Sequence, residues 1–135
     1  MLIAHSQAYI IQFQKFRNLE LLKYFKKLKI HNVVICMRDE LTNVPKHTKN
    51  IIMNLEDNNG NGSHWVCIFN SQDKYYFDSF GLPPPVEVIN FLQNGVYQTF
   101  QVQELNSKCC GQLCLYVLFQ LNKNKNFNDI IFNLI

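Results

Sequence analysis

The 135 residues of this chain are enough for one folded domain with a single core. Hydrophobic residues make up 47% of the chain and aromatic residues 13%, which excludes an intrinsically disordered protein. The net charge of +3 comes mainly from the lysines at positions 23, 26, 27 and 29. They share one predicted helix, and a solvated helix face explains them better than nucleic-acid contact does.

The cysteines indicate a reducing environment, and the apolar runs predict neither a signal peptide nor a membrane segment. The chain has five cysteines, an odd number, and Cys109 and Cys110 are adjacent, so we do not expect a secreted disulfide framework. The first five residues lack the basic start and the long apolar core of a signal peptide. The longest apolar run, residues 113–119, is far too short to cross a bilayer. We therefore expect a protein of a reducing compartment, or of a particle assembled there, that has no membrane contact.

The beginning of the chain is expected to be helical. Leu19, Leu22, Phe25 and Leu28 recur every three residues, which predicts an amphipathic helix over residues 18–29. Residues 8–16 are apolar but less regular, and they fit either a helix or a strand. On this basis the single domain divides into an N-terminal helical part, about 1–31, and a core part, about 32–135.

Short apolar runs in the core part predict strands. Residues 33–37 and 50–55 are typical of buried strands, and the polar segment between them is a loop. After a turn cluster at 57–63, residues 64–69 and 75–80 form two strands joined by a loop of hairpin length. Residues 97–105 alternate well enough to predict one more strand.

Three helices complete the predicted elements. Residues 86–93 follow three prolines and predict a helix that directs Val86, Ile89 and either Phe91 or Leu92 inward. Residues 110–121 are nearly all apolar, and a helix that is apolar on all sides is buried in the middle of a domain. Residues 127–135 form a closing helix or the start of something longer.

Cys110 is a candidate nucleophile because it opens the helix predicted to be buried. The N-terminus of a helix carries partial positive charge and free N–H groups, which lower the pKa of a thiol and can bind an oxyanion. Gly111 follows and lets another backbone approach the sulfur closely. Taken alone, such a cysteine is more often a small buried hydrophobe, which is our interpretation of Cys36, Cys67 and Cys114.

His64 and Asp78 are candidates for a general base and the group that orients it. His64 follows a Gly-Ser turn and opens a strand, so its ring can lie at the rim of a cleft, although a lone histidine here is usually structural. Asp78 lies in an aromatic stretch of the neighbouring strand, where a buried carboxylate needs a partner. Asp73 competes for this role, but it lies in the turn and should be solvated. We expect His64 and Asp78 to meet across the hairpin within hydrogen-bond reach.

Gln103 and Trp65 are the remaining candidates at this site. Gln103 lies seven residues before Cys110, and its amide can donate to a carbonyl oxygen that becomes negative. Trp65 faces the opposite side of its strand from His64 and is either a core residue or the wall of a cleft. A thiol, a base, an orienting carboxylate and an oxyanion donor are the parts that a cysteine hydrolase needs.

The sequences around these residues resemble those of the adenovirus-type processing protease, adenain. The resemblance is closest to its relatives in Polinton/Maverick elements, adintoviruses and virophages. The matching segments, spread over about residues 33–121, are Met37 to Leu41, Ile52 to Asn54, Gly62 to Trp65, Tyr76 to Gly81, Gln103, and Ser107 to Gly111.

The resemblance implies a role for each matching residue. His64 is the base, Asp78 the orienting group, Gln103 the oxyanion donor and Cys110 the nucleophile. Cys110 is chosen over Cys109 because the family's nucleophile directly precedes glycine and follows the glutamine by seven residues. The resemblance also implies that Trp65, Asn54 and Gly111 bind substrate, with Trp65 walling a channel that admits only small residues.

The resemblance further implies the fold and the activity. The fold is α+β and papain-like, with a small mixed or antiparallel sheet packed on a buried central helix that carries the nucleophile. The activity is that of a cysteine endopeptidase, which needs neither cofactor nor metal and cleaves viral or transposon-encoded virion precursor proteins next to small residues such as glycine. We expect a monomer that acts on capsid or other precursor proteins in the host cytoplasm or nucleus and within the virion.

One departure concerns activation. The adenoviral enzyme is activated by a peptide that forms a disulfide with a cysteine upstream of the glutamine. This chain has no cysteine between Cys67 and Cys109, so that mode of activation is not carried over. A net charge of +3 gives little support to activation by DNA. Whether a peptide or DNA activates the protein is left open.

Three other interpretations stay open. A protease for ubiquitin-like modifiers of the SUMO type uses the same four residues, but it needs a broad docking surface that 135 residues hardly supply. A catalytically inactive structural relative would have the same sequence features. A zinc module lacks the usual paired two-residue cysteine spacings. Its candidate ligands are His64, Cys67, Cys109, Cys110 and Cys114.

Overall fold

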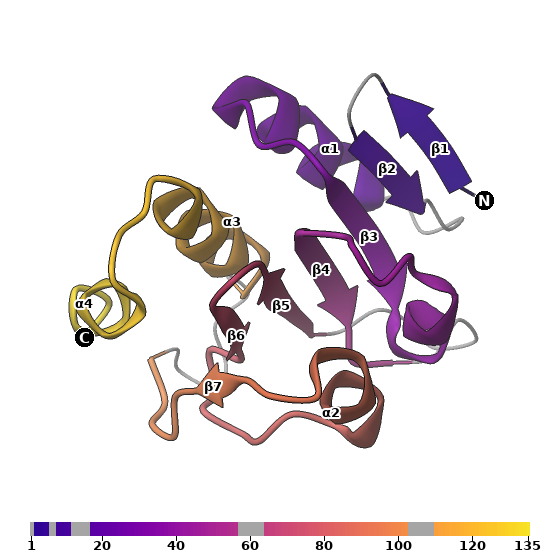
Figure 1. Ribbon diagram of the computed structural model, residues 1–135. Coiled ribbons are helices and arrows are strands. Elements are labelled where there is room, and N and C mark those ends of the chain that lie inside the picture. The colour runs from indigo at the N-terminus through magenta and orange to yellow at the C-terminus, as the bar shows by residue number, and fades with distance from the viewer. Residues whose placement is uncertain (1, 6–7, 12–16, 57–63, 103–109) are drawn as a thin grey trace.

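The computed structural model describes residues 2–5, 8–11, 17–56, 64–102 and 110–135, with side chains from residue 23 onward. Figure 1 shows the elements in the order β1 (Leu2–His5), β2 (Ala8–Ile11), α1 (Arg17–Leu28), β3 (Val33–Met37), η1 (Arg38–Asn43), β4 (Asn50–Asn54), β5 (Trp65–Asn70), β6 (Lys74–Phe77), α2 (Val86–Leu92), β7 (Val96–Tyr97), α3 (Cys110–Asn122) and α4 (Phe127–Phe132). No helix within these ranges is long and apolar enough to span a bilayer.

A five-stranded mixed sheet forms the centre of the fold, in the order β3-β4-β5-β6-β7. The pairs β3/β4 and β6/β7 are parallel, whereas β4/β5 and β5/β6 are antiparallel. Strands are therefore present at all four of the positions that the apolar runs from 33 to 80 predict. The last of these strands, β6, ends at Phe77 instead of residue 80, so that Asp78 lies just beyond the strand.

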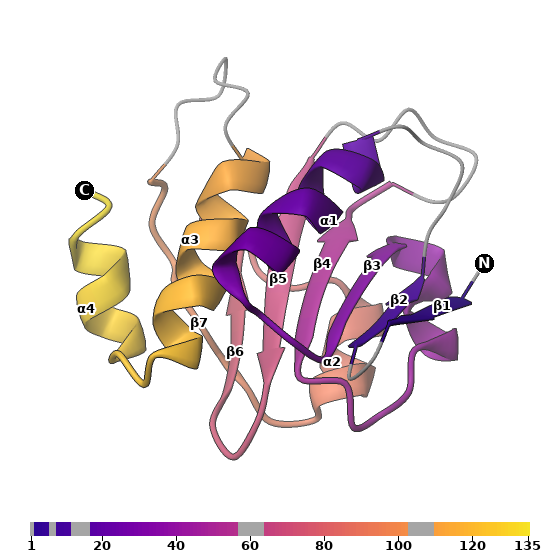
Figure 2. The same cartoon turned by 90° about the horizontal axis from the view of Figure 1, so that it is seen from above.

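Helices cover both faces of this sheet, α1 and α3 one face and α2 with η1 the other (Figure 2). Strand β5 contributes alternate side chains to the buried clusters on the two faces of the sheet. Trp65, Cys67 and Phe69 belong to the buried cluster on the α3 side, and Val66 and Ile68 belong to the cluster on the α2 side. A strand buried on both faces needs a continuous apolar run, which residues 65–69 supply.

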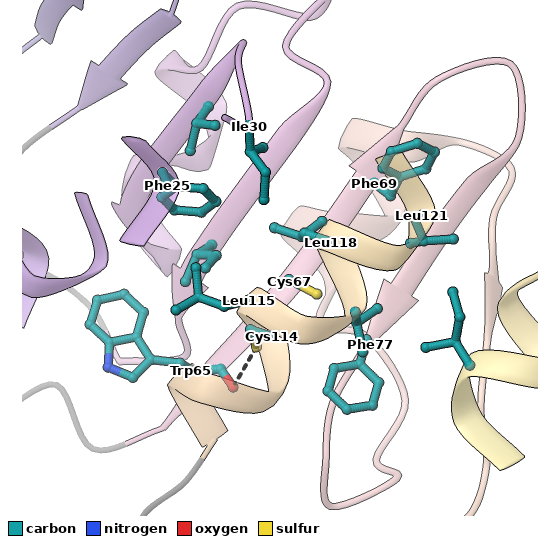
Figure 3. Close-up of a cluster of buried hydrophobic side chains, with 14 of the residues drawn as sticks. Phe25, Ile30, Trp65, Cys67, Phe69, Phe77, Cys114, Leu115, Leu118 and Leu121 are labelled. Atoms are coloured by element: carbon teal, nitrogen blue, oxygen red, sulfur yellow. Dashed lines mark hydrogen bonds between the residues drawn. The ribbon is translucent and has the colours of Figure 1, made fainter. Parts of the chain in front are cut away.

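Helix α3 is the buried central helix that the sequence predicts. Cys114, Val117 and Leu118 are fully buried, and Figure 3 shows Leu115, Leu118 and Leu121 of α3 in one cluster with Phe69 and Phe77 of the sheet. Truncating such a leucine to alanine typically costs about 2–5 kcal/mol of unfolding free energy. This packing fixes where the N-terminus of α3 lies relative to the sheet.

The N-terminal part is only partly helical, which corrects the expectation for residues 1–31. The predicted amphipathic helix is present as α1, but Leu2–His5 and Ala8–Ile11 form an antiparallel pair of strands that lies beside β3 (Figure 1). The β-branched and aromatic residues of Tyr9 to Ile11 favour an extended strand over a helix.

Two further details differ from the sequence-based expectations. The strand predicted over residues 97–105 is reduced to Val96–Tyr97, with 98–102 outside any strand and 103–105 outside the described residues. Helix α2 buries Val88, Phe91 and Leu92, whereas Val86 and Ile89 are 63% and 53% exposed. A helix of two turns with apolar residues on two stripes does not reveal from its sequence which stripe faces the sheet.

Candidate active site

Three side chains from three separate elements meet at one end of the sheet. His64 lies just before β5, Asp78 just after β6, and Cys110 is the first residue of α3. Because β5 and β6 run antiparallel, the start of one lies beside the end of the other. The Trp65 N–H, at the start of β5, donates to the Cys110 sulfur at 3.5 Å, which brings the N-terminus of α3 to the same place.

The imidazole of His64 is held at its edge and at its face. Its Nε2 atom lies 2.7 Å from Asp78 Oδ1, so the contact predicted across the hairpin is confirmed. The Asp78 side chain is 1% exposed, and its Oδ1 also accepts the Phe80 N–H at 2.9 Å. The Phe80 ring stacks on the imidazole with centroids 4.3 Å apart and an angle of 9° between the planes. Together these contacts leave the ring little freedom to rotate.

The second ring nitrogen is available for the thiol, because Asp78 occupies Nε2. Burial acts to lower the pKa of His64, but hydrogen bonds to Asp78 and Cys110 outweigh it and raise the pKa to about 9. For Cys110, burial acts to raise the pKa, but hydrogen bonds from His64 and from the Trp65 N–H lower it below its ordinary value. Both shifts favour the thiolate–imidazolium form of the pair over the form in which thiol and imidazole are neutral.

This behaviour separates Cys110 from two other buried cysteines. Burial is the main cause that raises the pKa of both Cys36 and Cys114. The Cys114 thiol donates to the Trp65 carbonyl oxygen at 3.5 Å, within the buried cluster of Figure 3. Thiols of this kind are unreactive, whereas a lowered pKa is the property that a nucleophilic cysteine needs.

The residues expected to bind substrate lie close to these groups in different environments. Gly111 follows Cys110 on α3 and is partly exposed, whereas Trp65 is 5% exposed and belongs to the core cluster on the α3 side. Asn54 is fully buried at the end of β4. Its Oδ1 accepts the Glu56 N–H at 3.0 Å, and its Nδ2 has no hydrogen-bond partner within the described ranges. Their roles in binding stay predictions. Gln103 and Cys109 lie outside the described residues.

Two residues beside the site had no role assigned from the sequence. Phe80 stacks on His64, and the amide of Gln98 donates to the Asp78 backbone carbonyl. The aromatic at the second position after Asp78 belongs to a matching segment, but nothing in a linear sequence indicates a stacked ring. Gln98 follows two exposed strand residues and has no motif around it.

Other features of the described residues lie apart from this group. A cavity of about 190 Å³ lies against α2, with Pro83, Pro84, Ile89 and Tyr97 among its lining residues. Within the described ranges, no three histidine, cysteine or acidic side chains gather into a group that could hold a metal ion. The described members of the alternative zinc set, including Cys67 and Cys114, do not form such a group.

Comparison with solved structures identifies the fold. The chain superimposes on the crystal structure of the ASFV pS273R protease with a TM-score of 0.58 and 18% sequence identity, covering 93% of this chain and 62% of that one. No protein-family model matches the sequence, and no curated protein matches it. The likeness establishes the fold and confirms the predicted α+β, papain-like architecture.

The chain spans less than two thirds of the ASFV protease. The likeness covers 93% of this chain, so it extends over most of the elements described above.

Proposed function

We propose that this protein is a cysteine endopeptidase of the adenain-like group. Cys110 acts as nucleophile, His64 as base, Asp78 as the group that orients His64, and Gln103 as oxyanion donor. The observation that carries the proposal is the continuous contact from Asp78 through His64 to Cys110 at the N-terminus of a buried helix. A protease of similar fold supports it.

The chemistry follows from the positions of these groups. The Cys110 thiolate attacks the scissile carbonyl carbon, and the developing oxyanion is stabilised by the Gln103 amide and by free N–H groups in the first turn of α3. The His64 imidazolium then protonates the leaving amine, which leaves a thioester on Cys110. His64, now neutral, takes a proton from water, the water attacks the thioester, and the free enzyme is restored. Asp78 keeps the imidazole in place throughout.

The substrate follows from the family resemblance. The motifs around His64, Asp78 and Cys110 support a processing protease related to those of Polinton/Maverick elements, adintoviruses and virophages. The substrate would be a capsid or other virion precursor protein, cut next to a small residue such as glycine. On this proposal the protein would act in the host cytoplasm or nucleus and within the virion.

The decisive experiment is a comparison of Cys110→Ala with Cys109→Ala. Each protein is incubated with a peptide library rich in glycine at internal positions, and the cleavage products are identified by mass spectrometry. Cys110→Ala should abolish cleavage, because the Cys110 thiol hydrogen-bonds to His64, whereas Cys109→Ala should retain substantial activity. Equal loss in both variants, or loss in Cys109→Ala alone, would show that the wrong sulfur has been chosen.

The same assay tests the rival functions. A wild-type protein that cuts no peptide but removes the C-terminal extension of a folded ubiquitin-like modifier would be a SUMO-type protease. A wild-type protein that cuts neither, and whose Cys110 is not alkylated faster than an ordinary thiol at neutral pH, would be an inactive structural relative.

A further inference from the structure

The turn that carries Asp78, residues 78–81, contacts residues 98–102 through backbone atoms. The Val102 N–H donates to the Ser79 carbonyl at 2.8 Å. Gly81, with φ +73°, lies so close to the same segment that a Cβ atom on it would be 2.6 Å from the Phe100 carbonyl carbon. Both contacts depend on backbone atoms of residues 98–102, which would be present with almost any side chains there.

Gln98 provides a third link, and this one depends on its side chain. Gln98 is 6% exposed, and its Nε2 donates to the Asp78 backbone carbonyl, which also accepts the Gly81 N–H at 2.8 Å. The Asp78 carbonyl can only accept, so the nitrogen of the Gln98 amide must face it. The Gln98 Oε1 atom is buried and has no hydrogen-bond partner among the residues that the structure describes. An apolar residue would fill this space without leaving an unpaired buried oxygen, so packing alone does not explain a glutamine here.

The two hydrogen-bonding ends of Asp78 are thus fixed by different groups. Its backbone carbonyl is held by Gln98 and Gly81, and its carboxylate oxygen Oδ1 is held by the Phe80 N–H while it contacts His64. If the carbonyl end moves, the carboxylate moves with it, because only the short bonds of one residue separate them. Among the described residues, the titratable groups that act on the His64 imidazole are the Asp78 carboxylate and the Cys110 thiol.

We propose that Gln98 is a positioning residue of the active site, whose buried amide holds the Asp78 turn so that the carboxylate stays against His64. This inference rests on the proposed function of His64 and Cys110. Gln98 touches neither substrate nor the reacting atoms, and it acts through Asp78. Without its amide, the carboxylate stabilises the imidazolium less well, and the thiolate–imidazolium pair exists over a narrower range of pH on both sides.

The test measures the rate of Cys110 alkylation by iodoacetamide as a function of pH, with mass spectrometry to assign the modified cysteine. The variant Gln98→Met keeps the length of the side chain and removes the donor, and Gln98→Glu keeps the shape while placing an acceptor against the carbonyl. Gln120→Met on α3, far along the helix from Cys110, is the matched control. Thermal unfolding of each protein is recorded in parallel, and no substrate is needed.

In wild type and in Gln120→Met, the alkylation rate of Cys110 should rise with pH at the same midpoint, which lies below the pKa of an ordinary thiol. In both Gln98 variants this midpoint should move upward by roughly one pH unit. Variants with a lower melting temperature but an unchanged midpoint would make Gln98 a merely structural residue and overturn the inference. Failure of both variants to fold would also overturn it, because Gln98 would then serve the fold itself. If the alkylation rate of Cys110 in wild type rose only at the pH of an ordinary thiol, the proposed function would be refuted instead.

Discussion

At the scale of single residues, the site is distinguished by how one imidazole is held. Asp78 Oδ1 lies 2.7 Å from Nε2 at the ring edge, where it supplies charge and orients the ring, and the Phe80 ring covers the face with centroids 4.3 Å apart, which restricts its tilt. The aromatic face also limits access of water to the ring on that side. Both neighbours come from the same short turn after β6, which makes that turn the support of the proposed base.

The raised pKa of His64 predicts a pH profile. The imidazolium is stabilised in the folded protein, so its contribution to stability is full below pH 6.5 and is lost as the pH rises through about 9. The proposed active pair needs that proton, so kcat/KM should fall as the pH rises through about 9. In Asp78→Asn the basic limb of the kcat/KM profile should move to lower pH and the acid limb to higher pH, because a neutral amide stabilises an imidazolium less well than a carboxylate does. Peptide cleavage rates across pH 5–10 check this; identical limbs in both proteins would contradict it.

Gln103 is expected to act only in the transition state. A donor that meets the oxyanion but not the ground-state carbonyl is worth on the order of 10²–10³ in turnover. Gln103→Ala should therefore lower kcat by about that factor, with little change in KM and an unchanged melting temperature. Steady-state kinetics and thermal unfolding measure both. An unfolded variant would mean that Gln103 serves the structure and not the reaction.

At the scale of elements, the turn 78–81 depends on a glycine. Gly81 has φ +73°, a conformation that L side chains rarely adopt, and its Cβ would collide with the Phe100 backbone. Gly81→Ala should lower the unfolding free energy by about 1–3 kcal/mol and reduce activity beyond what stability explains, because the same turn supports His64.

Gly95→Ala is the matched control for this prediction. A Cβ on Gly95 would meet the flexible end of the Leu92 side chain at 3.1 Å, and Leu92 can adjust more easily than a backbone can. Chemical denaturation of both variants, with activity measured well below the midpoint, separates the two effects. Equal losses at Gly81 and Gly95 would show that the turn has no special place in the site.

At the scale of the whole molecule, helices cover both faces of the sheet, and the candidate site lies at one end of its strands. The expected specificity for small residues is tested there. A bulky residue would have to displace packed side chains near Cys110, and overpacking of that kind costs about 1–3 kcal/mol, or roughly one to two orders of magnitude in rate. Peptides with glycine at the scissile bond should be cut and the same peptides with leucine should not.

The role of Trp65 in this specificity needs a mild variant. Its side chain is 5% exposed in the core, so Trp65→Ala would cost about 3–5 kcal/mol in stability. Trp65→Phe keeps an aromatic core residue while it reduces the size of the wall, and it should relax the preference if the indole forms the channel. Equal cleavage of glycine and leucine peptides by wild type would refute the channel and weaken the case for a processing protease.

The sequence by itself determined the elements with strong local patterns. The run from Cys110 to Leu121 is nearly all apolar and predicted a buried helix, and the runs from Val33 and Asn50 predicted buried strands; α3, β3 and β4 confirm these predictions. The pairing of His64 with Asp78 was also within reach, because a hairpin brings the start of one strand to the end of the next. These inferences rest on contacts between near neighbours in the chain.

Only the tertiary structure decided what depends on segments far apart in sequence. It selected Val88, Phe91 and Leu92 as the buried stripe of α2, ended β7 at Tyr97, and turned Gln98 onto the Asp78 carbonyl. None of these follows from a local pattern, because each is fixed by which surface another part of the chain presents. The pKa of Cys110 belongs to the same class: burial alone would raise it, and contacts from His64 and Trp65 lower it. The periodicity of a sequence predicts which elements are buried, whereas the packing of distant segments determines which polar atoms form hydrogen bonds.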